Sequence, residues 1–333
     1  MLRAFAFSGL LTIGAVLWAL TSGVSAALTV LVLIAIEIAF SFDNAIINAK
    51  VLERLSHFWQ QLFLTVGVVI AVIGMRLLFP IIIVVLTAHV GWHQVIDEAL
   101  HHPDVYARQL NGAHTAIAAF GGAFLLTLAL YFLLDDNREV LWLERLERPL
   151  QRIGGSIWLP PLLVILLVTL LGHFSPDHSH QIVQAGLIGA LGYAALKLFI
   201  DGLGRLAPSK GQYVGWAAFA AFIYLQILDA SFSFDGVLGA FAITNKVLLI
   251  ALGLGVGAFW VRSLTVVLVR RKTLGLYIYL EHGAHYAILA LAAALLASLF
   301  WNVPDAVTGL TGLGIIGASF IESYQLLHRR PAS

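Results

Sequence analysis

Apolar runs of about twenty residues follow one another along almost the whole 333-residue chain. A helix needs roughly 20 residues to cross about 30 Å of hydrocarbon, so runs of this length are typical of membrane spans. We therefore predict an all-α polytopic membrane protein with about ten transmembrane helices, forming a single transmembrane domain over residues 1–333. The predicted spans are residues 4–22, 26–49, 61–87, 112–134, 156–173, 181–200, 214–244, 247–268, 274–299 and 306–327.

The composition agrees with this class and excludes several others. Charged residues make up 11% of the chain and hydrophobic residues 60%, whereas a soluble domain carries roughly 25% charged residues. A net charge of +1 provides no basic surface for a nucleic acid. The absence of cysteine excludes disulfides and thiolate metal sites, and no Walker A motif is present. We therefore expect neither an enzyme nor a nucleic-acid partner, and the lipid bilayer is the first expected partner.

Lysine and arginine are distributed unevenly among the predicted loops. Fifteen of them fall on the side that holds both termini, and the other side has only Arg108 and Lys246. The positive-inside rule therefore predicts that both termini are cytoplasmic. The first apolar run, which follows Arg3, also resembles a cleavable signal peptide, but we expect it to be retained as a span.

Two connecting segments are amphipathic. Residues 135–155 mix acids and arginines with apolar residues and include Pro149. This pattern predicts a cytoplasmic helix at the membrane interface, with a solvated connector as the alternative. Residues 88–110 predict an external amphipathic hairpin or short helix.

A polar motif occurs twice, 192 residues apart. Residues 37–44 (EIAFSFDN) and 229–236 (DASFSFDG) share an acid, a serine and a Phe-Asp pair in the same register. Because the matching spans lie five apart, an odd number, the two copies have opposite orientations. We therefore predict an inverted-topology repeat with cores at residues 26–134 and 214–300, an architecture typical of secondary transporters with a site near the midplane. Two weaker pairs accompany the motif, namely Asn111–His114 with His282–His285 and Arg76 with Arg262.

Four carboxylates lie within the predicted spans, where each charge costs roughly 2.5–3.5 kcal/mol and therefore indicates function. With two intramembrane arginines the charges sum to −4 + 2 = −2, which one divalent cation would neutralise. Oxygen ligands without thiolates favour Mg²⁺, Ca²⁺ or Mn²⁺. The predicted metal ligands are Glu37, Ser41, Asp43, Asn44, Asn48, Asp229, Ser233 and Asp235.

The helical register leaves two arrangements open for the aspartates of the Ser-Phe-Asp steps. At 100° per residue, Glu37, Ser41, Asn44 and Asn48 share one helix face, and Asp43 lies about 120° away. Either the helix breaks near each Ser-Phe-Asp step, so that both aspartates reach one site, or these aspartates face other helices. In the second arrangement they pair with the intramembrane arginines.

Four further residues are candidates for gating or charge balance. They are Arg76, Arg262, His114 and His285. Each histidine follows a Gly-Ala step at the start of an apolar run. The alternative for the histidines is an ordinary hydrogen-bonding role at a helix end.

The paired motifs, at residues 37–45 and 229–237, resemble the signatures of TerC-type integral membrane proteins. Residues 120–125, 135–136 and 142–147 look like a branch of that superfamily long catalogued as a domain of unknown function. The resemblance implies a bacterial inner (plasma) membrane protein, linked to tellurium-resistance and metal-stress operons and, for several members, to manganese efflux. Carried over by position, it implicates Glu37, Asp43, Asn44, Asp229 and Asp235.

These observations lead to one expected function and one alternative. The expected function is a secondary transporter that exports a divalent cation, preferentially Mn²⁺, by alternating access coupled to protons. The ion is then cargo rather than a permanent cofactor. The alternative is a membrane scaffold or metal sensor of a stress-resistance complex. Its partners would be cytoplasmic stress-response proteins docked on the arginine-rich 138–152 loop.

Overall fold

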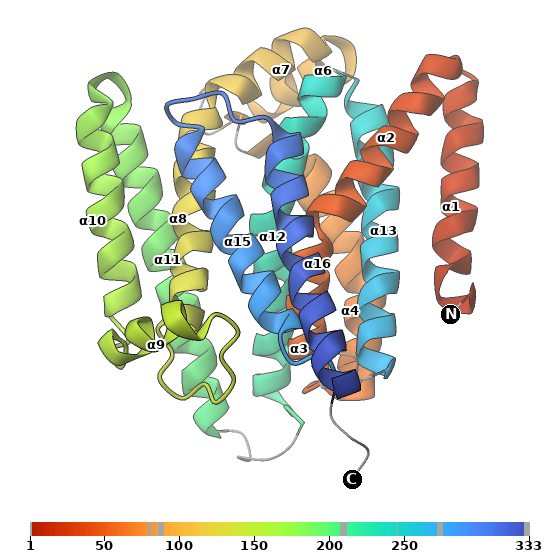
Figure 1. Ribbon diagram of the computed structural model, residues 1–333. Coiled ribbons are helices and arrows are strands. Elements are labelled where there is room, and N and C mark those ends of the chain that lie inside the picture. The colour runs from red at the N-terminus through yellow and green to blue at the C-terminus, as the bar shows by residue number, and fades with distance from the viewer. Residues whose placement is uncertain are drawn as a thin grey trace. The chain divides into compact units, whose positions relative to one another are not determined.

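The computed structural model describes the backbone of residues 2–78, 81–82, 84–85, 90–206, 212–244, 246–271 and 276–329. Over these residues the elements are helices (Figure 1). Each of the ten predicted apolar runs coincides with one helix or with one pair of consecutive helices. The prediction of an all-α polytopic membrane protein is confirmed.

The helices follow in chain order. They are α1 (Leu2–Leu20), α2 (Val24–Phe40), α3 (Phe42–Leu52), α4 (His57–Val69), the π-helix η1 (Ile70–Leu78), α6 (Trp92–His101), α7 (Pro103–Gly112), α8 (His114–Leu133), α9 (Glu144–Ile153), α10 (Leu159–Phe174), the 3₁₀ turn η2 (Pro176–His178), α11 (Ser179–Leu206), α12 (Trp216–Ile243), α13 (Val247–Arg271), α15 (Leu280–Ala297) and α16 (Asp305–Arg329).

Length and composition alone qualify five stretches of the described chain as membrane spans, or six if one bent helix pair counts as a span. The five are His57–Gly74, His114–Leu133, Pro176–Phe199, Val247–Arg270 and Leu280–Ala297. The bent pair is Val24–Ala39 with Phe42–Leu52. The other predicted spans are occupied by helices that are shorter or less apolar over their described residues, so the count of about ten stays a prediction.

The chain divides into two compact units, and neither is continuous in sequence. Unit 1 consists of Met1–His114 and Gln212–Val267, and unit 2 of Thr115–Gly211 and Leu268–Ser333. The predicted repeat cores, 26–134 and 214–300, each contribute to both units. The inverted repeat therefore stays a prediction, but both copies of the Ser-Phe-Asp motif belong to unit 1.

The first copy of the motif interrupts its helix. The helix axis bends by 50° between Val24–Ala39 and Phe42–Leu52, and Ser41 is the residue at the break. The second copy lies within α12, which is helical from Trp216 to Ile243. The predicted break therefore occurs at Ser41 and not at the corresponding step of α12.

Glycines of α13 allow α2 to approach closely within unit 1. A Cβ atom at Gly253 would lie 2.5 Å from Leu33 Cβ, and one at Gly257 would lie 2.5 Å from Glu37 Cβ. Contacts this short do not occur between real side chains, so only glycine permits this packing. Because the glycines are four residues apart, as are Leu33 and Glu37, the two helices meet along a continuous strip.

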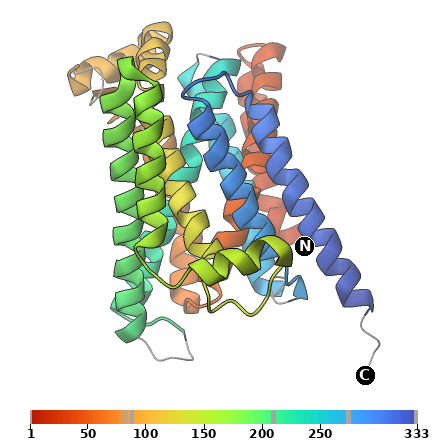
Figure 2. The ribbon, with the colours of Figure 1, turned by 60° about the vertical axis from the view of Figure 1, so that its left-hand side comes forward.

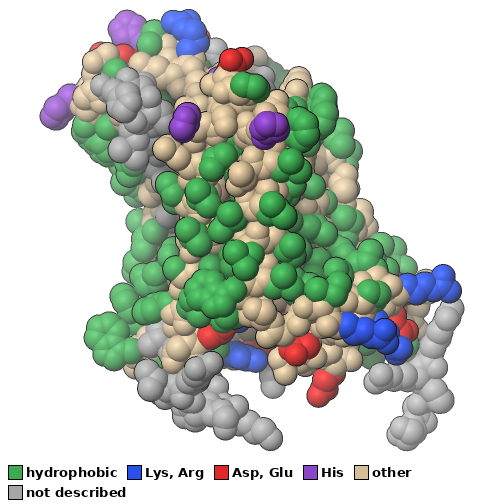
Figure 3. Space-filling model, turned by 90° about the vertical axis from the view of Figure 1, so that its left-hand side faces the viewer, with side chains coloured by type: hydrophobic (Ala, Val, Ile, Leu, Met, Phe, Trp, Pro, Cys, Tyr) green, Lys and Arg blue, Asp and Glu red, His purple; other side chains and the backbone are tan. Residues whose placement is uncertain are grey.

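Unit 2 contains α8 from Thr115 onward, two pairs of adjacent helices and the short helix α9. α10 packs beside α11, and α15 beside α16 (Figure 1). Figure 2 shows α9 lying across the end of α15 rather than parallel to it. On the face that Figure 3 shows, hydrophobic side chains fill the middle, while Lys, Arg, Asp and Glu lie at the two ends, mainly at one of them. This distribution is typical of a helix pair that faces lipid.

Candidate functional site

The centre of the candidate site in unit 1 is the buried carboxylate of Asp229 on α12. Its Oδ1 atom accepts hydrogen bonds from the side-chain amides of Asn44 and Asn48 on α3, at 2.7 and 2.8 Å. Its Oδ2 atom forms an ion pair with Arg262 of α13. Because Asn44 and Asn48 are four residues apart, they project from one face of α3. Three helices thus meet at one carboxylate.

Arg262 extends this junction to α4. Its guanidinium donates to the carbonyl oxygens of Phe63, at 3.1 Å, and Gly67, at 3.4 Å. Its Cζ atom also lies 3.7 Å from the centroid of the Phe63 ring, within the range of a cation–π interaction. Arg262 is only 5% exposed, so its charge is held by protein groups rather than by solvent.

Gly67 makes room for two of these polar side chains. A Cβ atom at this position would lie 2.8 Å from Gln226 Nε2 and 3.3 Å from Arg262 Nη1. Gln226 lies three residues before Asp229 on α12, so both side chains occupy the same side of that helix. A side chain at Gly67 would therefore have to displace the ends of the Gln226 and Arg262 side chains.

Several amide atoms around Asp229 are buried without a hydrogen-bond partner among the described residues. They are the Oδ1 atoms of Asn44 and Asn48 and both polar atoms of the Gln226 side chain. These three residues are between 1% and 6% exposed. An unsatisfied buried polar group costs roughly 1–3 kcal/mol, so the concentration of such groups beside one carboxylate makes this junction the candidate polar site.

The break between α2 and α3 holds the remaining described ligand candidates. Ser41 donates to Glu37 Oε1 at 2.8 Å, and the backbone N–H of Asn44 donates to Asp43 Oδ1 at 2.8 Å. Asp43 lies in the first turn of α3, where the helix dipole stabilises a negative charge. All three side chains are buried. The first copy of the motif thus places these three oxygen-bearing side chains in the protein interior, and their role as metal ligands stays a prediction.

Three predicted site residues have side chains that the structure does not describe. The side chains of Arg76 on η1 and of Ser233 and Asp235 on α12 lie outside the described residues. In the part of the chain that is described, no group of three or more His, Asp or Glu side chains is arranged to hold a metal ion. The groups that could contribute to a cation site here are one carboxylate, Asp229, and the amide oxygens around it.

The two predicted gating histidines have different surroundings. His285 is buried in α15, stacks on Phe132 with ring centroids 3.6 Å apart, and donates from Nδ1 to the Glu281 carbonyl at 2.8 Å. His114 is half-buried at the first residue of α8. The described contacts of His285 are those of a packed, hydrogen-bonded side chain, and a gating role for either residue stays a prediction.

Residues 42–330 match a family described as a protein of unknown function (DUF475). The chain belongs to the DUF475 family. The match spans both units and includes every described site residue except Glu37 and Ser41. No curated protein and no solved structure matches the chain. The expected membership of a family of unknown function is thus confirmed. The relation of this family to TerC-type proteins stays a prediction.

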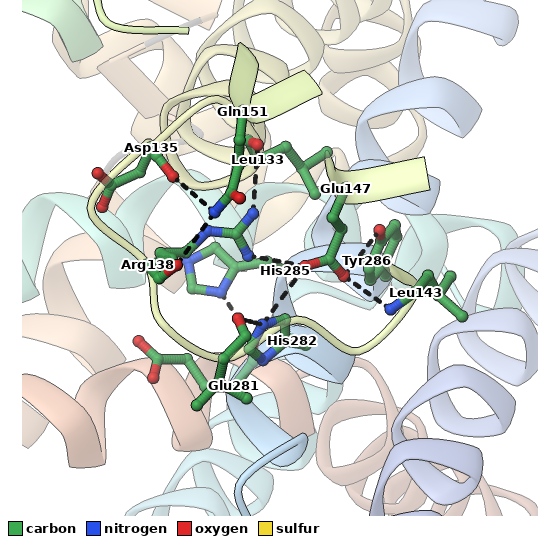
Figure 4. Close-up of polar contacts among 11 residues, drawn as sticks. Leu133, Asp135, Arg138, Leu143, Glu147, Gln151, Glu281, His282, His285 and Tyr286 are labelled. Atoms are coloured by element: carbon green, nitrogen blue, oxygen red, sulfur yellow. Dashed lines mark hydrogen bonds and ion pairs between the residues drawn. The ribbon is translucent and has the colours of Figure 1, made fainter. Parts of the chain in front are cut away.

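A second buried polar cluster of this DUF475 protein, in unit 2, was not predicted as a site (Figure 4). Its centre is Glu147 of α9, which is 0% exposed. Arg138 pairs with Glu147 Oε2 at 3.2 Å, and the backbone N–H of Leu143 and the Tyr286 hydroxyl donate to Oε1 at 3.0 and 3.2 Å. His282 Nε2 lies 3.6 Å from Oε2 and donates to the Val140 carbonyl at 2.9 Å.

This cluster attaches α9 to α15. Gln151, one turn after Glu147, donates to the carbonyl oxygens of Asp135 and Arg138. The polar face of α9 is therefore turned toward the protein. The sequence carries no signal that would distinguish Glu147 from Glu144, because both are acids on the same short charged helix, and only the packing of α15 separates them.

Proposed function

We propose that this DUF475 protein is a secondary transporter that exports a divalent cation, with Mn²⁺ as its preferred cargo. The observation that carries the proposal is the junction at Asp229, where a buried carboxylate is surrounded by buried amide oxygens that lack partners among the described residues. Carboxylate and amide oxygens are hard ligands that suit Mn²⁺, Mg²⁺ and Ca²⁺. The proposal involves no catalytic step.

Arg262 gives the site a charge-balanced state in the absence of cargo. A carboxylate alone at membrane depth is costly, whereas the Asp229–Arg262 pair is neutral. In the proposed cycle an arriving cation takes the place of the guanidinium beside Asp229. Arg262 then keeps its contacts with the carbonyl oxygens of Phe63 and Gly67.

The asparagine side chains can serve both states. In the arginine-paired state, Asn44 and Asn48 direct their N–H groups to the carboxylate. Rotation of each amide by half a turn exchanges its nitrogen and oxygen positions, which would direct Oδ1 toward a cation bound at Asp229. Gln226 Oε1 is a further ligand, and Glu37, Asp43 and Asp235 are the acids that we propose exchange the metal for protons.

The sequence motifs support the same proposal. Their resemblance to TerC-type proteins suggests that the DUF475 family is a branch of that superfamily, placed in the bacterial inner membrane with both termini in the cytoplasm. Two carboxylate-bearing copies in opposite orientation are typical of alternating access. The chain would thus carry its ion between two mirrored halves of one site.

The test is ion flux in proteoliposomes that contain the purified protein and an imposed pH gradient. Mn²⁺, Ca²⁺ and Mg²⁺ are compared for the wild type and for the variants Asp229→Asn and Asp235→Asn. Asp97→Asn is the matched control, because Asp97 is an exposed carboxylate on α6. We expect selective Mn²⁺ flux that both site variants lose and the control retains.

The same experiment separates the alternative function. Intact wild-type protein that conducts none of the three ions, even though it binds Mn²⁺, would overturn the transporter proposal. That result would favour a membrane scaffold or metal sensor with cytoplasmic partners. Undiminished flux in both site variants would instead overturn the proposed site.

A further inference from the structure

The exposed surface of α9 has an arrangement that the transport proposal does not use. Glu147 and Gln151 on one side of the helix are turned toward the protein, as their hydrogen bonds show. At 100° per residue, Leu146, Leu150 and Ile153 lie on one flank of this attached side, and Arg145, Arg148 and Arg152 lie on the other. We call the first the apolar flank and the second the basic flank.

The apolar flank is open rather than packed. Leu146 is 49% exposed and Ile153 is 63% exposed. A surface helix of a soluble protein turns its apolar residues toward the core, but α9 turns polar residues inward and leaves its apolar residues outside. This inversion indicates that the surroundings of the apolar flank are themselves apolar.

The apolar surface continues from α9 into the next helix. Trp158, just before α10, is 52% exposed, and Leu162 and Leu166 on α10 are 58% and 68% exposed. α10 is an apolar helix that faces outward in unit 2 (Figure 3). Only residues 154–158 separate the two helices, so the apolar flank lies close to where α10 enters the hydrocarbon. Trp158 is the residue type that gathers at this boundary.

The basic flank carries a net positive charge at the surface. Arg145 and Arg152 are exposed, and the ion pair of Arg148 with Glu144 is itself exposed, so solvent weakens it. Counting Glu144 and the three arginines gives −1 + 3 = +2, because Glu147 is buried and paired with Arg138. Basic residues beside an apolar flank are the pattern by which helices bind anionic lipid headgroups.

From this geometry we propose that α9 is a binding site for anionic phospholipid, with its apolar flank in the acyl-chain boundary and its basic flank on the phosphate groups. The positive-inside prediction puts α9 on the cytoplasmic side, where anionic lipids act on basic segments. Lipid is favoured over a protein partner because the apolar flank continues onto a helix that faces the bilayer. The buried Glu147 cluster holds α9 in this orientation.

The test uses full-length protein in nanodiscs and a single fluorescent label. The chain has no native cysteine, so Ile153→Cys labelled with bimane reports the apolar flank, and Glu144→Cys reports the other side. Brominated phosphatidylglycerol and brominated phosphatidylcholine are compared as quenchers at one matched low mole fraction. We expect the Ile153→Cys label to be quenched more by the anionic lipid, and the Glu144→Cys label to be quenched less by either.

The headgroup preference is then tested with arginine variants in the Ile153→Cys background. We expect the combined Arg145→Gln, Arg148→Gln and Arg152→Gln variant to lose the preference for the anionic lipid. Each arginine should contribute a factor of about five to that preference at low salt. Arg108→Gln, which removes an exposed arginine of α7, should leave it unchanged. Thermal unfolding confirms that the variants remain folded.

Two outcomes would overturn the proposal. Equal quenching of the Ile153→Cys label by both lipids, with the three arginines intact, would mean that α9 meets the bilayer without recognising charge. No quenching by either lipid would mean that the apolar flank is covered by something else, as expected for a docked cytoplasmic protein. Neither readout depends on ion flux, so the result is independent of the transport proposal.

Discussion

Arg262 of α13 and Asp229 of α12 form a buried ion pair whose carboxylate also accepts two amide hydrogen bonds from α3. The pair joins residues 33 positions apart in sequence, and the amides come from more than 180 positions away. Without a bound cation, such a buried pair is stable only while both members remain charged and in contact. If Asp229 is the proposed cation ligand, the two charges should have separable effects on stability and on ion flux.

Removing only the Asp229 carboxylate should destabilise the protein. In Asp229→Asn the buried Arg262 charge loses the carboxylate, and we expect a loss of about 3–5 kcal/mol in the free energy of unfolding. The double variant Asp229→Asn with Arg262→Gln removes both charges and should regain most of that loss, yet remain inactive in Mn²⁺ flux. Denaturation and flux measured on the same preparations check this. A double variant as unstable as the single one would show that the pair is not the main interaction of Arg262.

A second acid beside Asp229 should make stability depend on the cation. Asn48→Asp replaces a hydrogen-bond donor with a like charge, which lowers the melting temperature in chelator. Because a ligand that binds only the folded state stabilises by about 2.7 kcal/mol at a hundred times its Kd, added Mn²⁺ should raise the melting temperature more in this variant than in the wild type. Asn48→Leu is the control, and it should respond less than the wild type. Equal shifts in all three proteins would exclude Asn48 as a ligand.

Two glycines near the site should respond differently to alanine. In Gly257→Ala the new Cβ meets Glu37 Cβ, which is fixed to the backbone, whereas in Gly67→Ala it meets the ends of the Gln226 and Arg262 side chains. We expect Gly257→Ala to cost about 1–3 kcal/mol through overpacking. Gly67→Ala should lower stability less than Gly257→Ala does but reduce Mn²⁺ flux more, because the new Cβ displaces Arg262. Comparison of melting temperature with flux for both variants checks this, and the reverse order would contradict it.

The two glutamates of α9 provide a matched pair. Glu147 is fully buried and paired with Arg138, while Glu144 forms an exposed pair with Arg148. We expect Glu147→Gln to cost about 3–5 kcal/mol and to accelerate proteolysis within residues 137–153. Glu144→Gln should change stability by less than about 1 kcal/mol. Similar cleavage rates for the two variants would argue against Glu147 as the attachment of α9.

The helices of the fold could be predicted because apolar length is a local property. Each predicted run coincides with a helix or a helix pair. Of the four residues predicted to share one face, Asn44 and Asn48 do so on α3, whereas the break at Ser41 puts Glu37 on α2. The break at Ser41 was predicted as one of two arrangements. The matching step at Ser233 lies in an unbroken helix, although both steps have the sequence Ser-Phe-Asp. A break depends on what packs against the helix, which the local sequence does not contain.

The partners of the buried charges could not be predicted. One of the two arrangements left open by the sequence paired Arg76 or Arg262 with the aspartates of the Ser-Phe-Asp steps. The structure shows an ion pair of Arg262 with Asp229, at the start of the second motif, which the sequence did not indicate. Gln226 was overlooked, although a polar residue inside the apolar segment around it is a usable signal. Pairing depends on how distant helices pack, so it appears only when α4, α12 and α13 are assembled.

The glycine strip of α13 has a consequence for movement. Leu33 and Glu37 of α2 pack directly on Gly253 and Gly257 of α13, with no side chain between them. If the two helices slid past each other, these side chains would clash with the larger neighbours of the glycines. We therefore expect α2 and α13 to move together as one rigid body. The interrupted backbone at Ser41 is the joint at which α3 can turn against that body. Opening and closing would then be a rotation of α3 about Ser41. This rotation would move Asn44 and Asn48 toward or away from Asp229, while Glu37 stays packed against Gly257 of α13.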